Sequence, residues 1–106
     1  MGAYVREHVR ERNAILTDDA YTFPIMLFSG RPDVFVDHVD RGDRYWSSVL
    51  AGPFGVVRYV LVYTGPANDR INARYPRIHS GMQPGFTVVH RVGPYFLARV
   101  ALRPPA

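Results

Sequence analysis

The sequence predicts an α/β domain in which a sheet of about five strands lies between two layers of helices, a three-layer α/β/α sandwich. Short apolar runs rich in β-branched and aromatic residues alternate with longer amphipathic segments, the order expected of strands connected by helices. The chain has 106 residues and no cysteine, so residues 1–106 can bury a core as a single domain without disulfides. Helices that connect successive strands of one sheet form right-handed crossovers between parallel strands. We therefore expect a mostly parallel sheet with a C-terminal antiparallel hairpin.

The first part of the chain predicts two helices separated by a buried strand. Two valines four residues apart lie on one face of a helix over residues 3–12, with glutamate and arginine on its wetter faces. The apolar run at 14–17 is typical of a buried strand. A helix over about 20–28 follows, because an aspartate stands where it can cap the first turn. The segment Ser29–Pro32 ends this helix with a glycine and then a proline.

The middle of the chain contains the clearest strand. A short strand is expected at 34–36, and a helix is expected from Asp43, as its N-cap, to Leu50, where Ala-Gly-Pro ends it. The segment 56–63, VVRYVLVY, consists almost entirely of apolar, β-branched and aromatic residues. A strand of this composition is buried on both faces, so we place it near the middle of the sheet.

The last part of the chain predicts a helix and a hairpin. A helix of about ten residues begins after Thr-Gly-Pro at 64–66, and Pro76 ends it early. Its apolar face would contain Ile71, Tyr75 and Ile78. Two further strands, at 86–92 and 95–102, are joined by Gly-Pro and form an antiparallel hairpin.

Charge is distributed unevenly along the chain. All thirteen basic residues are arginine, and the net charge is −2 over residues 1–53 and +6 over residues 54–106. Clustered arginines can bind a polyanion, but here they occur singly along predicted strands, as on a solvated face. We therefore expect no nucleic-acid partner.

Acidic residues follow the first two predicted strands. Asp18 and Asp19 follow the first strand, and Asp37 and His38 follow the second. Open parallel sheets bind ligands beyond the carboxyl ends of their strands, where carboxylates and a histidine can hold a divalent cation or act as acid and base. Alternatively, these residues cap helices and solvate loops. The sequence leaves both interpretations open.

No cofactor, resident metal or catalytic residue is predicted. A phosphate-binding glycine loop of the Walker type needs a lysine, and the chain has none. The four histidines lack the spacing of metal ligands, and thiolate sites are excluded by the absence of cysteine.

Three arginines form the remaining candidate site. Arg70, Arg74 and Arg77 are spaced so that they share one face of the fourth predicted helix. Such a face can meet anionic lipid headgroups or a phosphorylated carrier. The alternative is a solvated helix face.

Several stretches in order resemble a known family: Tyr4–His8, Ile15–Asp19, Ser29–Phe35, Val57–Val62, Asn72–Pro76 and Tyr95–Val100. They resemble the soluble C-terminal domain that follows the membrane helices in polytopic proteins of GC-rich bacteria. Those proteins are similar to polyprenyl-phosphate-dependent glycosyltransferases of the GT-C type, which resemble dolichyl-phosphate-mannose protein mannosyltransferases. The resemblance implies a domain excised from a larger membrane protein.

The same resemblance implies a function. It implies a non-catalytic accessory domain on the extracytoplasmic side of the cell membrane, since the catalytic acid of that family lies between early membrane helices. The implied partners are the transmembrane part of the parent protein and the membrane surface or a glycan acceptor. Two alternatives stay open: a freestanding cytoplasmic domain that binds a small anion or sugar phosphate, and a small metal-dependent enzyme that uses the strand-end carboxylates. Whether the chain is an enzyme is therefore left open.

Overall fold

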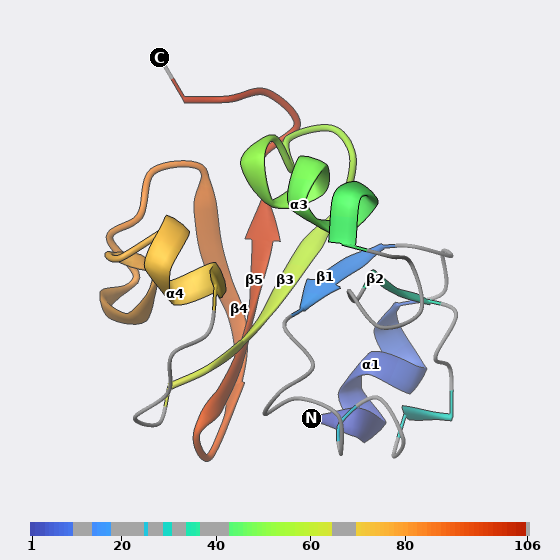
Figure 1. The fold of residues 1–106 in the computed structure, drawn as a ribbon. Coiled ribbons are helices and arrows are strands. Elements are labelled where there is room, and N and C mark those ends of the chain that lie inside the picture. The colour runs from blue at the N-terminus through green and yellow to red at the C-terminus, as the bar shows by residue number, and fades with distance from the viewer. Residues whose placement is uncertain are drawn as a thin grey trace.

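A computed structural model describes residues 1–9, 14–17, 25, 29–30, 34–36, 43–64 and 70–105 (Figure 1). The side chains of Asp43, Arg70, Asn72 and His79 lie outside this description. Its helices are α1 (Gly2–His8), α3 (Asp43–Ala51), α4 (Arg70–Arg74) and a short 3-10 helix, η2 (Ile78–Ser80). Its strands are β1 (Ile15–Thr17), β2 (Phe35–Val36), β3 (Tyr59–Tyr63), β4 (Phe86–Val92) and β5 (Tyr95–Val100). The helix expected over 20–28 lies outside the described residues except for Ile25, which is buried.

The five strands form one mixed sheet in the order β2-β1-β3-β5-β4. β1 pairs in parallel with β2 and with β3, whereas β5 pairs antiparallel with both β3 and β4. The α/β class, the central position of β3 and the C-terminal hairpin are thus confirmed. The expectation of a mostly parallel sheet is wrong, because β1 and β2 are very short and β5 pairs back along the whole of β3. Most of the ladder is therefore antiparallel.

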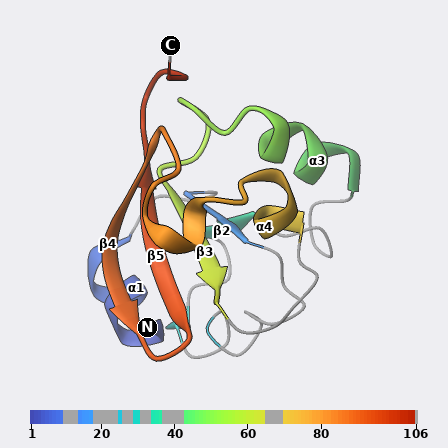
Figure 2. The ribbon, with the colours of Figure 1, turned by 90° about the vertical axis from the view of Figure 1, so that its left-hand side faces the viewer.

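Helices pack on the two faces of this sheet. Successive strand residues alternate between two apolar clusters, as Ile15 and Leu16 of β1 do. One cluster joins Ile15, Leu61 and Leu97 to Val5 of α1. Figure 2 shows α1 on one side of the sheet and α3 and α4 on the other. The second cluster contains the buried side chains of α3 and α4 together with Leu16, Val36, Val60, Val62, Phe96 and Ala98.

A stack of three rings fastens α1 to the sheet edge. The Tyr4 ring lies between the imidazoles of His8 and His90, with centroid separations of 4.1 and 3.9 Å and nearly parallel planes. His90 lies on β4, at an irregularity of the ladder between Val88 and His90. The bulge therefore presents the His90 ring to α1.

Three element boundaries differ from the expected ones. α1 ends at His8, because Val9 adopts an extended conformation (φ −118°, ψ 111°). β3 begins at Tyr59, because Gly55 at φ 75° belongs to a turn that delays the strand. β5 ends at Val100. Both α3 and the early end of α4 before Pro76 lie where the sequence predicts them.

No helix in the described ranges is long and apolar enough to cross a bilayer.

Candidate functional site

The acidic residues predicted at the strand ends are outside the described part of the chain. Asp18, Asp19, Asp37 and His38 all fall in these gaps, so a site built on them stays a prediction. Among the residues that the structure describes, no three His, Asp or Glu side chains come close enough to hold a metal ion.

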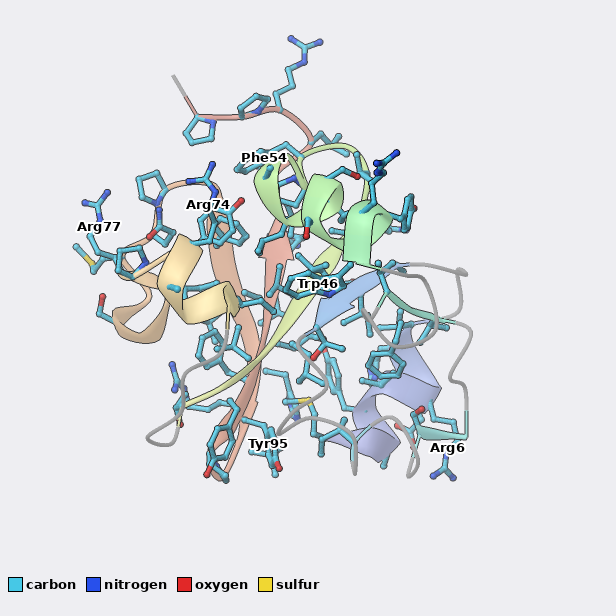
Figure 3. All side chains as sticks on the ribbon, viewed as in Figure 1. Arg6, Trp46, Phe54, Arg74, Arg77 and Tyr95 are labelled. Atoms are coloured by element: carbon cyan, nitrogen blue, oxygen red, sulfur yellow. The ribbon has the colours of Figure 1, made fainter. Side chains whose placement is uncertain are left out.

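Buried hydrogen bonds hold the carboxyl end of β1, which is the described part of the predicted strand-end site. Thr17, the last residue of β1, is fully buried, and its Oγ1 donates to the Leu61 carbonyl at 3.3 Å. The Trp46 indole of α3 donates from Nε1 to the Thr17 carbonyl at 2.8 Å. Trp46 is the largest fully buried side chain and lies between α3 and the sheet (Figure 3). These bonds fix α3 against β1, and their role is structural.

The three arginines predicted to share one helix face do not all lie on a helix. α4 ends at Arg74, so Arg77 lies in the following turn and the helical spacing does not apply to it. Figure 3 shows Arg74 extending toward α3 and Arg77 extending away from the domain. The Arg70 side chain lies outside the description. Both described arginines are exposed.

Residues at the end of α4 complete the C-terminus of α3. The Tyr75 hydroxyl donates to the Leu50 carbonyl at 2.6 Å, and Arg74 Nη2 donates to the Ala51 carbonyl at 3.5 Å. These carbonyls belong to the last turn of α3, where partners inside the helix run out and positive charge is favourable. Burial raises the pKa of the Tyr75 hydroxyl, and the nearby Arg74 charge opposes that shift. Arg74 thus has a structural role that the sequence did not predict.

A cavity of about 320 Å³ lies where β3 begins and β5 ends. Its walls come from two short segments that are far apart in the sequence, and they consist of Val57, Arg58, Arg99, Val100, Ala101 and Leu102. A backbone hydrogen bond from Val100 N to the Arg58 carbonyl, at 2.8 Å, holds the segments together. In the next register position, Tyr59 pairs with Arg99.

Two arginines and four apolar residues line the cavity. Val57 and Val100 are buried and belong to the core, whereas Arg58 and Arg99 are exposed. Each guanidinium offers several N–H donors in a planar array suited to phosphate or carboxylate oxygens. The described residues that line the cavity include no carboxylate, histidine or hydroxyl. What the lining offers is therefore anion binding and apolar contact.

Sequence reasoning missed this cavity for a topological reason. It lies at the amino end of β3, opposite the strand ends at which parallel sheets bind ligands. Its two arginines come to line one cavity only because β5 pairs with β3. The excess of arginine after residue 53 was the one available signal.

Comparisons of the chain with protein-family models, curated proteins and solved structures found no match. The resemblance to domains of GT-C-type membrane proteins therefore stays a prediction from the sequence.

Proposed function

We propose that this domain is a binding module that takes up an anionic group, a phosphate or carboxylate, in the cavity between Arg58 and Arg99. The observation that carries the proposal is that both arginines line one cavity whose other described lining residues are all apolar. The lining supplies donors and positive charge, which suit recognition of an anion more than acid–base chemistry. The net charge of +6 over residues 54–106 supports attraction of an anion to this half of the chain.

The wider setting is proposed from the sequence resemblance. It is that of a non-catalytic accessory domain, on the extracytoplasmic side of the cell membrane, of a glycosyltransferase-like membrane protein. An anion-binding cavity suits that setting, because polyprenyl-phosphate carriers and anionic headgroups both present phosphate. For the whole chain we also propose the three-layer α/β/α arrangement, supported by the packing of α1 on one sheet face and of α3 and α4 on the other.

Titration with inorganic pyrophosphate tests the cavity. With sodium chloride added to match ionic strength, we expect pyrophosphate to shift the backbone amide resonances of residues 57–59 and 99–102. A ligand at ten times its Kd stabilises a folded protein by about 1.4 kcal/mol, which raises the Tm of a domain of this size by about 6 °C.

A matched pair of variants makes the test specific. Arg99→Ala should abolish the stabilisation, whereas Arg77→Ala, which removes an exposed arginine outside the cavity, should retain it. Equal responses of the two variants, or resonance shifts confined to other parts of the domain, would refute the proposal.

A further inference from the structure

We infer that the anionic group bound in this cavity belongs to lipids at a bilayer surface, and that the end of the domain around the cavity docks on anionic membranes. The inference rests on the proposed function and specifies its ligand. It comes from exposed aliphatic side chains beside the two cavity arginines.

Two aliphatic side chains project into solvent at this end of the molecule. Leu102 is 82% exposed and lines the cavity, and Val56, in the turn before β3, is 54% exposed. The two segments lie side by side: a Cβ built on Gly55 would stand 3.0 Å from the Leu102 carbonyl. In Figure 1 this turn and the C-terminal segment run together near the start of β3 and the end of β5. The exposed aliphatic groups therefore belong to one end of the domain.

Positive charge lies next to these aliphatic groups. Arg58 and Arg99 line the cavity, and Arg103 follows Leu102 in the exposed C-terminal segment. After residue 53 the chain contains one acidic residue, Asp69, so neither of the two segments contains an aspartate or a glutamate. This end therefore contains two arginines that share a cavity lining with the exposed Leu102 and a third that follows it in the sequence.

This combination matches the chemistry of a bilayer interface. Aliphatic side chains gain by entering the boundary between headgroups and acyl chains, while arginines bind the phosphates and the negative surface potential. A small soluble anion would use the arginines but would leave Leu102 and Val56 in water. A lipid headgroup in a bilayer therefore accounts for both the arginines and the exposed aliphatic side chains.

Sedimentation with vesicles tests the inference. We expect binding to vesicles of phosphatidylcholine mixed with phosphatidylglycerol and none to pure phosphatidylcholine, with the affinity falling as salt is added. Leu102→Asp and Arg99→Glu should each lower the partition coefficient by about tenfold or more. Thermal unfolding of each variant checks that the fold is retained.

Matched controls carry the same chemical changes at other positions. Met82, 70% exposed in the loop between η2 and β4, gives Met82→Asp, and Arg77 gives Arg77→Glu. Both control variants should bind anionic vesicles within about twofold of the unaltered chain, because neither residue belongs to the docking end. Equal losses in Arg77→Glu and Arg99→Glu would indicate unspecific attraction of a basic protein and would overturn the inference.

The remaining outcomes separate this inference from the proposed function. If pyrophosphate shifts the cavity resonances but vesicles do not bind, the cavity binds soluble anions and the membrane inference fails. If neither ligand binds, both proposals fail. Self-association in sedimentation velocity that is lost in Leu102→Asp, without vesicle binding, would show that a second copy covers this end and would equally overturn the inference.

Discussion

Replacing Tyr75 by phenylalanine tests the bond that joins the end of α4 to the C-terminus of α3. The substitution keeps the buried ring and removes only the hydroxyl, which donates to the Leu50 carbonyl at 2.6 Å. A hydrogen bond of this kind contributes about 0.5–1.5 kcal/mol net, and the carbonyl left without its partner adds to the loss. We expect Tyr75→Phe to lower the free energy of unfolding by about 1 kcal/mol, or the Tm by about 5 °C.

The effect should depend on pH in a defined direction. Burial raises the pKa of Tyr75 above the ordinary value of 10.0, so the unfolded chain loses the hydroxyl proton first as the pH rises. The stabilisation by this group is therefore complete below pH 10 and decreases as the pH rises from there through the folded-state pKa. Tyr75→Phe lacks the titrating group. The difference in the free energy of unfolding between this variant and the unaltered chain should therefore narrow above pH 10, by at most about 1.4 kcal/mol per pH unit.

Urea unfolding followed by tryptophan fluorescence measures both effects. Trp46 is the single tryptophan and is fully buried in the fold, so its emission reports unfolding. Tyr45→Phe is the control, because the Tyr45 ring is 44% exposed on α3, and it should change stability by less than about 0.5 kcal/mol. An unchanged stability of Tyr75→Phe at pH 7, or a gap that widens above pH 10, would refute this account of the contact.

Two further predictions concern a close approach and a ring stack. Gly85 and Gly93 both have positive φ (89° and 55°), so alanine should cost about 1 kcal/mol at either position. At Gly85 the new Cβ would also lie 2.6 Å from Phe54 Cε1, so Gly85→Ala should be the worse by about another 1 kcal/mol in thermal unfolding; equal losses would contradict this. In a double-mutant cycle of Tyr4→Leu with His90→Leu, the stacked rings should show a coupling of about 0.5–1.5 kcal/mol, and additive losses would mean that the stack does not stabilise the fold.

Capping residues, helix breakers and strand propensity located most of the described helices and strands, because each of these signals depends on only a few neighbouring residues. The start of α3 at Asp43 and its end at Ala51, before Gly-Pro, follow from capping and helix-breaking chemistry. The run VVRYVLVY predicted a strand with two buried faces, and β3 is indeed the middle strand. The first three residues of this run do not belong to β3, because the chain there forms or leaves the turn around Gly55. A propensity argument cannot detect such a turn when the residues after it favour a strand so strongly.

The candidate site was far less predictable than the fold. The strand-end acids Asp18 and Asp19 were inferred from the rule for parallel sheets, and they lie outside the described residues. The cavity with Arg58 and Arg99 instead lies at the other end of β3. Neither arginine has a local pattern that distinguishes it from the other arginines of the second half of the chain.

Within the described residues, the sequence by itself determined which segments are helices and strands, since periodicity, caps and turn residues act between neighbours in the chain. Only the tertiary structure decided how those strands combine. The sheet places β5 between β3 and β4, which makes most of the ladder antiparallel and brings Arg58 and Arg99 to the lining of one cavity. Strand order depends on which apolar faces pack together across the whole core, and that information is spread over residues that no local pattern links.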